Sequence, residues 1–355
     1  MTQVDKLRAK GITGKGIKVA VIDSGIDYLH PALGGCYGKD CLISFGHDFV
    51  GDDYINNTYG FTCTAPGVSL GAYRVFGCSG SGGNDVLIAA FNKAYQDGAN
   101  IITASIGGSS GWAQDVWADA VSRIVDKGIP CVVSAGNEGD KGIFYASSPA
   151  DGQHVSAIAS FDNVQKPSIL HLSKYQVDDG PEQSFGYVPP KLSNSWDGVN
   201  LPAWGAKYVL FYNDAPGVAF EVKFDAPAPG AISAASMVDA ETGETFIKAL
   251  KGGKRLTLKM VGPKNAELRI LTANNTMSGG AVTFSSWGPT FEMRSKPQYG
   301  AIGGTVLSTF PRAKGSYAVP SGTSMACPQA AGIIALIRQV RGAITPQEIE
   351  YLLHI

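Results

Sequence analysis

Three polar side chains lie where glycine-rich turns meet apolar runs, and their types and positions suit a reactive site. Asp23 directly follows the apolar run 17–22, which is typical of a buried strand. Asn137 lies in a glycine turn just after the apolar run 130–135, and Ser324 opens a strongly apolar helical pattern. A helix N-terminus offers free N–H groups and stabilises negative charge, so Ser324 stands where an anion could be bound. Each residue also has a structural interpretation: Asp23 could cap a turn, Asn137 could hold a tight turn, and Ser324 could be an N-cap.

The elements around these residues alternate between strand and helix. Apolar runs predict strands at 17–22, 68–76, 101–105, 130–135 and 154–161. Helical spacing of apolar residues predicts three helices, one from residue 84 to a stop at Gly98 and the others over 114–126 and 324–341. A fourth helix is predicted to begin at Pro346, because Thr345 and Glu348 can form a capping box at its start. Strands alternating with long helices indicate crossover connections and a mainly parallel sheet. We therefore expect an α/β fold, with Asp23 and Asn137 near the carboxyl ends of strands, where open sheets place their sites.

The pattern changes between about residues 162 and 283. Proline and glycine become more frequent, and the segment predicts strands at 207–212 and 255–260 with a short helix at 244–250. This composition is typical of a mixed, β-rich insertion. We expect three parts, which are residues 1–161, 162–283 and 284–355.

Composition and charge exclude several classes of protein. Of 355 residues, 44% are hydrophobic and 17% charged, which is enough apolar material for a sizeable core. The 29 Lys and Arg balance 30 Asp and Glu, so there is no basic field for nucleic acid. No apolar run reaches the roughly 18 residues that a membrane span needs, and the first residues show no apolar signal-peptide region. We expect no nucleic-acid partner, no membrane partner and no signal peptide.

Six cysteines are too few for a disulfide scaffold at this length. Cys36 and Cys41 bracket a short loop that a local disulfide could close. The sequence favours this disulfide and a pair of free thiols equally. The sequons at Asn56 and Asn274 fit the N-glycosylation pattern, which is common by chance.

Together and in this order, the three segments resemble the subtilisin-like serine proteases (subtilases, peptidase family S8). The stretch G-T-S-M-A-C-P around Ser324 is a very specific match, V-I-D-S-G-I-D around Asp23 is a good one, and S-A-G-N-E-G around Asn137 agrees with both. The similarity covers nearly the whole chain and is strongest to fungal extracellular members, with further matches at 65–77, 104–111 and 284–290. The family's fold is a three-layer α/β arrangement, with a mainly parallel sheet flanked by helices.

The resemblance implies hydrolysis of peptide bonds through an acyl-enzyme. Ser324 would be the nucleophile, activated by a histidine that Asp23 orients. Asn137 would donate its side-chain amide to the oxyanion, together with the Ser324 N–H. An extended peptide would lie by β-augmentation along two segments, Ser105-Ile106-Gly107 and Ser134-Ala135-Gly136. The resemblance further implies peptide or protein substrates and an extracellular location. It implies no cofactor; calcium occurs in the family, but no ligand cluster for it is evident here, so we assign no metal site.

The family's histidine lies in an H-G-T-H segment between the acid and strand 68–76, and this sequence has no such segment. It runs from Tyr54 to Tyr59 and into residues 61–67, so that a stretch on the order of two dozen residues is absent relative to the family. The chain has five histidines, and each is a poor substitute for the family's base. They are His30, His47, His154, His171 and His354.

A second irregularity lies in the insertion. Residues 206–213 resemble the later half of a protease-associated domain, but residues 186–202 are too short to hold the earlier half. Several family pieces are therefore absent together, which favours a splice variant, a faulty gene model or a decaying copy.

Three functional hypotheses follow. The first is a serine endopeptidase with Ser324 as nucleophile. The second is a catalytically inactive subtilase-like chain that binds peptides. The third comes from another class: Gly107-Gly108-Ser109-Ser110-Gly111 fits the G-x-S-x-G elbow of α/β-hydrolases, which would make Ser109 the nucleophile of an esterase.

Overall fold

The protein is described by a computed structural model covering residues 3–51, 64–77, 80, 82–189, 191–192, 208–214, 219, 222–224, 234–262 and 265–354. The chain forms two compact units. Unit 1 comprises Met1–Val164 and Thr276–Ile355, and unit 2 comprises Gln165–Asn275. The inserted unit therefore begins three residues later than the sequence boundary of 162, and it ends eight residues before 283.

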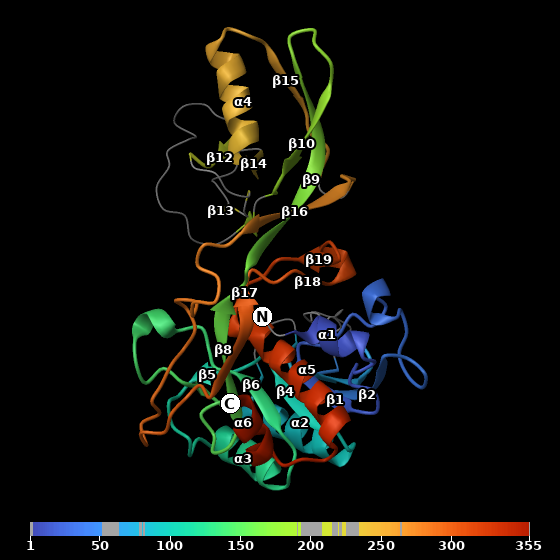
Figure 1. The fold of residues 1–355 in the computed structure, drawn as a ribbon, viewed down its shortest axis with the longest axis vertical. Helices are drawn as coiled ribbons and strands as arrows, with labels where there is room; N and C mark the ends of the chain where they lie inside the picture. Colours follow the sequence, from blue (N-terminus) through green and yellow to red (C-terminus); the bar gives the residue numbers. More distant parts are fainter. Residues whose placement is uncertain are drawn as a thin grey trace. The chain divides into compact units, whose positions relative to one another are not determined.

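Unit 1 is built on a seven-stranded sheet in which all neighbouring strands are parallel (Figure 1). Its strands, in spatial order, are β17 (Tyr299–Gly304), β8 (Ser156–Asp162), β6 (Cys131–Ser134), β4 (Ile101–Ala104), β1 (Lys18–Asp23), β3 (Ser69–Arg74) and β2 (Ile43–Asp48). The central strands are continuous apolar runs because both faces of such a sheet are buried. The predicted α/β fold is confirmed.

Helices cover both faces of this sheet and make the three layers that the resemblance implied (Figure 1). The side chains of β1 alternate between the faces. Val19 and Val21 pack in one core with α5 (Thr323–Arg341) and α6 (Pro346–His354), whereas Ala20 and Ile22 pack in the other with α2 (Asn84–Gln96) and α3 (Val116–Asp126). Fully burying such a side chain contributes about 1.5–3 kcal/mol.

Capping side chains set where the helices begin. The predicted capping box at α6 is present: the Glu348 N–H donates to Thr345 Oγ1 at 3.1 Å, and the Thr345 N–H donates to Glu348 Oε2 at 2.7 Å. Helix α3 begins two residues later than predicted because Asp115 acts as its N-cap and accepts from the Trp117 N–H.

Lys296 is a buried cation that ties a turn before β8 to the chain before β17. Its Nζ donates to the carbonyl oxygens of Gly152 at 2.9 Å and Val155 at 2.6 Å. Asp151 beside it is fully buried, and neither of its carboxylate oxygens has a hydrogen-bond partner among the described residues. Burial lowers the pKa of Lys296 to about 7 and raises the pKa of Asp151 to about 7, while the attraction between the two charges opposes both shifts.

Unit 2 is the mixed, β-rich insertion that the sequence indicated. The long strand β9 (Gln165–Val177) pairs antiparallel with β10 (Gln183–Tyr187), β15 (Leu256–Lys259) and β16 (Leu268–Asn274). A separate parallel pair, β12 (Tyr208–Tyr212) and β14 (Ala234–Val238), precedes α4 (Ala240–Lys251). Helix α4 starts four residues before the predicted 244, because Asp239 caps it by accepting from the Thr242 N–H at 2.8 Å.

Short elements complete the described chain. They are α1 (Val4–Ala9), the 3₁₀ turns η1 (Pro31–Leu33), η2 (Gly139–Lys141) and η4 (Arg312–Lys314), and the two-residue strands β5 (Gly108–Ser109), β7 (Ser147–Ser148), β11 (Lys191–Leu192), β13 (Lys223–Phe224), β18 (Ser308–Thr309) and β19 (Tyr317–Ala318). Within the described residues, no helix is long and apolar enough to cross a membrane.

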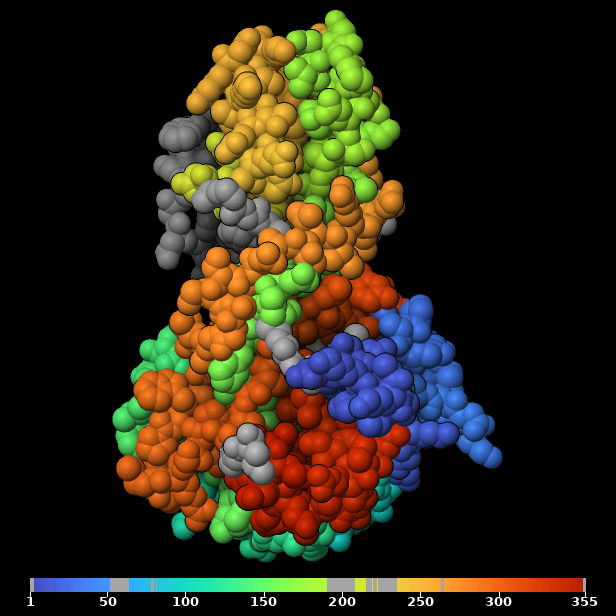
Figure 2. All heavy atoms as spheres, in the orientation of Figure 1, coloured from blue at the N-terminus to red at the C-terminus, as the bar shows by residue number. Residues whose placement is uncertain are grey.

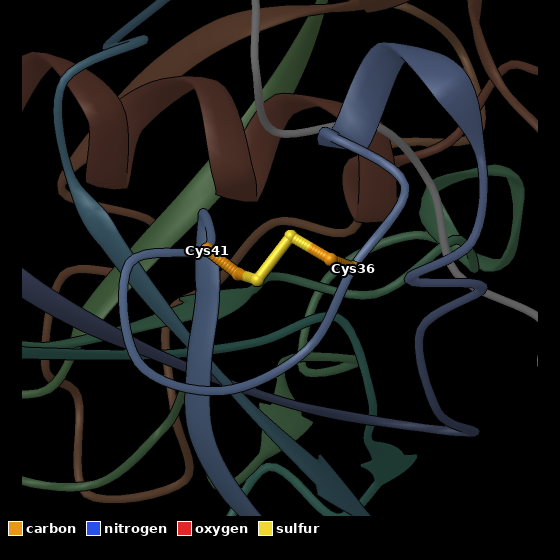
Figure 3. The surroundings of a disulfide bond; sticks show 2 residues. All are labelled: Cys36 and Cys41. Atoms are coloured by element: carbon orange, nitrogen blue, oxygen red, sulfur yellow. A yellow bond between two sulfur atoms is a disulfide. The ribbon is translucent and has the colours of Figure 1, made fainter.

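A disulfide joins Cys36 to Cys41 across the short loop before β2 (Figure 3). This is one of the two alternatives that the sequence left open. Cys131 and Cys327 are free and buried.

Candidate active site

Three of the predicted residues leave neighbouring strands at the same edge of the sheet. Asp23 is the last residue of β1, Ser105 directly follows β4, and Asn137 comes three residues after the end of β6. The three strands are adjacent and parallel in the order β6, β4, β1, so their carboxyl ends lie side by side. This is the edge at which open parallel sheets carry their sites.

Ser324 reaches this edge from the first turn of α5. The Ser105 hydroxyl donates to the Ser324 carbonyl oxygen at 2.8 Å, and the Ser324 hydroxyl lies 3.4 Å from the Ser105 carbonyl oxygen. The second of these bonds is long and weak. As the second residue of the helix, Ser324 has an N–H with no intrahelical acceptor, so that group is free to bind an anion. The N-cap position itself is taken by Gly322, so the interpretation of Ser324 as an N-cap is wrong.

Asn137 is exposed, and its side-chain oxygen accepts hydrogen bonds from Thr323. The Thr323 N–H donates to Asn137 Oδ1 at 2.9 Å. The fully buried Thr323 hydroxyl lies within hydrogen-bond distance of both Asn137 Oδ1 (3.0 Å) and the Gly136 carbonyl oxygen (3.2 Å), and it can donate to one at a time. Because a backbone N–H must face an acceptor, these contacts fix the amide with its oxygen toward Thr323. Asn137 Nδ2 then lies beside Gly322, where a Cβ on that glycine would be 3.8 Å away.

Asp23 is held by Ser24 and lies near the first turns of α5. The Ser24 N–H donates to Asp23 Oδ1 at 2.6 Å, and the Ser24 hydroxyl lies 3.1 Å from the same oxygen. Burial nevertheless raises the pKa of Asp23 to about 6, because the two hydrogen bonds from Ser24 offset only part of the desolvation. Burial also raises the pKa of the Cys327 thiol, one turn after Ser324, and the charge of Asp23 adds to that shift. No hydrogen bond joins Asp23 to Ser324 among the described residues.

The two segments expected to bind an extended peptide differ in their backbone pairing. Within the described chain, the backbone N–H and C=O groups of Ile106 and Gly107 form no backbone hydrogen bond. Ala135, in contrast, donates to Ile158 and accepts from Ser147, at 3.1 and 3.2 Å.

The backbone N–H and C=O groups of Gly136 are hydrogen-bonded as well. Its N–H points to Thr323 Oγ1 at 3.3 Å, and its carbonyl oxygen accepts from the Ser286 N–H at 2.9 Å. Ala135 and Gly136 are therefore bonded to neighbouring parts of unit 1, whereas Ile106 and Gly107 keep unpaired backbone groups within the described chain. A peptide lying along Ser105-Ile106-Gly107 and Ser134-Ala135-Gly136 stays a prediction.

Ser147 closes the space between these two segments. A Cβ on Gly107 would meet Ser147 Oγ at 2.2 Å and the Ser148 carbonyl oxygen at 2.8 Å. A Cβ on Gly136, whose φ is +105°, would lie 3.0 Å from Ser147 Cβ. Both glycines are required by this close approach, and any larger residue would displace Ser147.

The esterase hypothesis based on Ser109 is wrong. Ser109 belongs to the two-residue strand β5, which pairs with β7, and its hydroxyl bonds the Glu138 carboxylate. A nucleophile elbow needs a helix immediately after the serine, but α3 begins only at Val116.

No histidine whose side chain is described forms a hydrogen bond with Ser324. His30 uses both ring nitrogens elsewhere: Nε2 lies 2.8 Å from the Ser316 carbonyl oxygen, and Nδ1 accepts from the Ala32 N–H. His47 packs edge-to-face against Phe49, and the side chain of His154 forms a hydrogen bond with that of its neighbour Gln153.

His171 and His354 are the other two histidines of the chain. His171 lies in unit 2 against Tyr187. The side chain of His354 is outside the described residues. The join between Tyr54 and Tyr59 is outside them as well, and residues 52–63 contain no histidine in sequence.

Sequence reasoning missed two residues that shape the site. Thr323 fixes Asn137, and Ser286 accepts from the Glu138 N–H at 2.9 Å and so supports the same turn. A local hydrogen-bonding role for Thr323 could have been predicted from a threonine at a helix start, but its partner Asn137 could not. Nothing local to Ser286 indicates its role.

The described residues hold no group of three or more His, Cys, Asp or Glu side chains that could bind a metal ion.

Comparisons with known proteins agree with this architecture. The sequence model of the Subtilase family matches residues 54–354, and the chain belongs to that family. The chain is 27% identical to the minor extracellular protease Vpr of Bacillus subtilis, over 96% of this chain and 48% of the relative. It is 31% identical to subtilisin DY of Bacillus licheniformis (46% and 63%) and 31% identical to subtilisin-like protease 6 of the fungus Trichophyton verrucosum (56% and 48%).

The chain spans about half the length of the curated relatives that it matches. The alignment with Vpr runs over 404 positions, whereas 96% of this 355-residue chain is about 341 residues. More than 60 of the aligned positions therefore have no counterpart here. A solved cold-adapted subtilisin-like serine proteinase shares the fold with a TM-score of 0.52 and 19% identity, over 96% of this chain and 82% of that one.

Proposed function

We propose that Ser324 occupies the nucleophile position of a serine endopeptidase site that is incomplete in this chain. The observation that carries the proposal is the meeting of Ser324, Asn137 and Asp23 at one sheet edge, where no histidine with a described side chain forms a hydrogen bond with the serine. The chain would bind an extended peptide beside Ser324 without hydrolysing it at an appreciable rate.

The parts that remain suit a tetrahedral oxyanion. The Ser324 N–H and the Asn137 amide nitrogen are donors from two different elements at the mouth of α5. Such donors stabilise negative charge that develops on the carbonyl oxygen of a scissile bond. The free backbone groups of Ile106 and Gly107 would add the peptide as an antiparallel strand.

The missing part is the general base. A serine hydroxyl at neutral pH is a weak nucleophile until a neighbouring base takes its proton. Asp23 does not supply that function, because its carboxylate is bonded to Ser24 and not to Ser324. In subtilisin, removing the histidine alone costs about 10⁶ in kcat, nearly as much as removing the whole triad.

Peptide binding can be tested without catalysis. We expect a short peptide amide to bind, as measured by fluorescence anisotropy, and its affinity to fall when alternate backbone amides are N-methylated. The alternation follows because successive N–H groups of a strand point to opposite sides. Equal loss at every position, or no loss at any position, would contradict the strand-addition mode.

The nucleophile assignment has a separate test. Inserting the family's histidine segment between Tyr54 and Tyr59 should produce peptide-ester hydrolysis, and the same insertion combined with Ser324→Ala should not. Activity that survives Ser324→Ala would overturn the assignment of the nucleophile. A folded insertion variant without activity would overturn the assignment of the missing base.

We also infer that the protein is secreted and that unit 2 is a partial protease-associated domain. The relative Vpr, which is described as an extracellular protease, supports the first inference. The parallel pair β12 and β14 followed by α4 supports the second, because these elements contain the segment that resembles the later half of such a domain.

A further inference from the structure

Asn274 begins one of the two N-glycosylation sequons in the sequence, Asn274-Asn275-Thr276. It is the last residue of β16, and a turn follows from Thr276. Asn274 and Thr276 are both exposed, whereas Asn275 between them is buried. The acceptor amide and the hydroxyl residue that a glycosyltransferase reads are thus both accessible. The other sequon, at Asn56, is outside the described residues.

Within the described chain, one edge of the strand that ends at Asn274 has no partner strand. Among the described residues β16 pairs with β9 alone, over its whole length. Its side chains include two exposed apolar ones, Leu268 (45% exposed) and Ile270 (54%). A long edge strand with exposed apolar side chains can pair with another chain, and proteins block such edges with bulky or charged groups. Orange atoms, from the range of residues that includes β16, are visible on the face shown in Figure 2.

A second, independent feature indicates the compartment. The disulfide between Cys36 and Cys41 is typical of proteins that fold in an oxidising environment, such as the endoplasmic reticulum. In eukaryotic cells N-glycans are attached in that compartment.

We propose that Asn274 carries an N-linked glycan that covers the free edge of β16. In the attachment step, Asn274 Nδ2 displaces the diphosphate of a lipid-linked oligosaccharide from the anomeric carbon of its first sugar. A C–N bond forms, a C–O bond breaks, and the amide loses one proton to the transferase. The proposal does not depend on any activity of Ser324.

Occupancy is tested with a matched pair of variants. The chain is secreted from eukaryotic cells behind a cleavable leader, as wild type, as Thr276→Ser, which keeps the sequon, and as Thr276→Ala, which removes it. Treatment with a peptide-N-glycosidase should lower the mass of wild type and Thr276→Ser, and peptide mass spectrometry should find the carrier asparagine converted to aspartate at position 274. Thr276→Ala should show neither change at that position. Secreted, disulfide-bonded wild type with an unmodified Asn274 would overturn the proposal.

The shielding role has its own measurement. At equal concentration, light scattering should show more self-association for Thr276→Ala than for Thr276→Ser. Adding Ile270→Lys to Thr276→Ala should reverse the association, since a charge on an edge strand opposes pairing. If Thr276→Ala is glycan-free and as monomeric as Thr276→Ser, the shielding role is wrong.

Discussion

The backbone N–H of Thr323 lies 2.9 Å from Asn137 Oδ1, and this bond joins the first residue of α5 to the turn after β6. It means that the amide of Asn137 is oriented before any ligand arrives. A donor that is already oriented loses little entropy when charge develops opposite it, which is why such groups contribute strongly to catalysis. The amide that we propose as an oxyanion donor is therefore already held in place by Thr323.

Replacing the Thr323 hydroxyl should loosen this arrangement. Thr323→Val keeps the shape of this buried side chain but removes the hydroxyl that bonds Asn137 and Gly136. We expect a loss of about 1–3 kcal/mol in the free energy of unfolding. In a chain of this size each kcal/mol shifts Tm by roughly 2–4 °C. Thr323→Ser keeps the hydroxyl and is the control. If both variants melt at the same temperature, the hydroxyl does not stabilise the site.

Asp23 should make stability depend on pH. Its pKa is raised from 3.8 to about 6, so folding favours the protonated carboxyl, and this contribution to stability is complete below about pH 4 and is lost as pH rises through 6. Asp23→Asn resembles the protonated form. It should therefore be more stable than wild type at pH 8, by on the order of 1–3 kcal/mol, and close to wild type at pH 3.5.

Urea unfolding at the two pH values measures this difference. Asp126→Asn, a change at an exposed aspartate, is the control and should show no comparable gain. A gain from Asp23→Asn that is equal at both pH values would contradict the assignment to carboxylate burial.

Lys296 should be important for the stability of unit 1. Lys296→Met keeps most of the side-chain volume but removes one donor from each of the carbonyl oxygens of Gly152 and Val155. The Val155 N–H at 3.3 Å and Gln298 Nε2 at 3.0 Å are the donors that these two oxygens keep. It also leaves the buried Asp151 without a nearby positive charge. We expect a loss of about 3–5 kcal/mol, which is typical of breaking one side of a buried charged arrangement.

Adding Asp151→Asn to Lys296→Met should recover part of that loss, since it removes the uncompensated carboxylate. Lys314→Met, at an exposed lysine, should change stability by less than about 0.5 kcal/mol. Additive effects of Lys296→Met and Asp151→Asn, measured by chemical denaturation, would show that the two groups do not interact.

Much of unit 1 was predictable because its strands are buried on both faces. Runs such as 17–22 and 130–135 must be apolar throughout, and the order of strands and helices then restricts the topology. Asp23, Asn137 and Ser324 were predictable for the same reason, since each adjoins an element with a clear apolar signal.

The remaining features depend on contacts between distant parts of the chain. The pairing of Ala135 with Ser147 and of Gly136 with Ser286 occupies backbone groups in a segment whose local sequence does not indicate these partners. The long-range bond between Thr323 and Asn137 spans 186 positions, and nothing in either segment alone specifies it. Such contacts arise only when the sheet has brought the segments together.

The central claim is that Ser324 lacks a base in this chain, and labelling by a fluorophosphonate tests it most directly. These reagents are attacked by an activated serine and form a stable phosphonyl ester, so incorporation measured by intact-protein mass spectrometry reports activation of the hydroxyl. The unmodified chain, folded and with its Cys36–Cys41 disulfide formed, should incorporate no label beyond that of Ser324→Ala. Incorporation of about one equivalent at Ser324 would contradict the account and show that another group activates this serine.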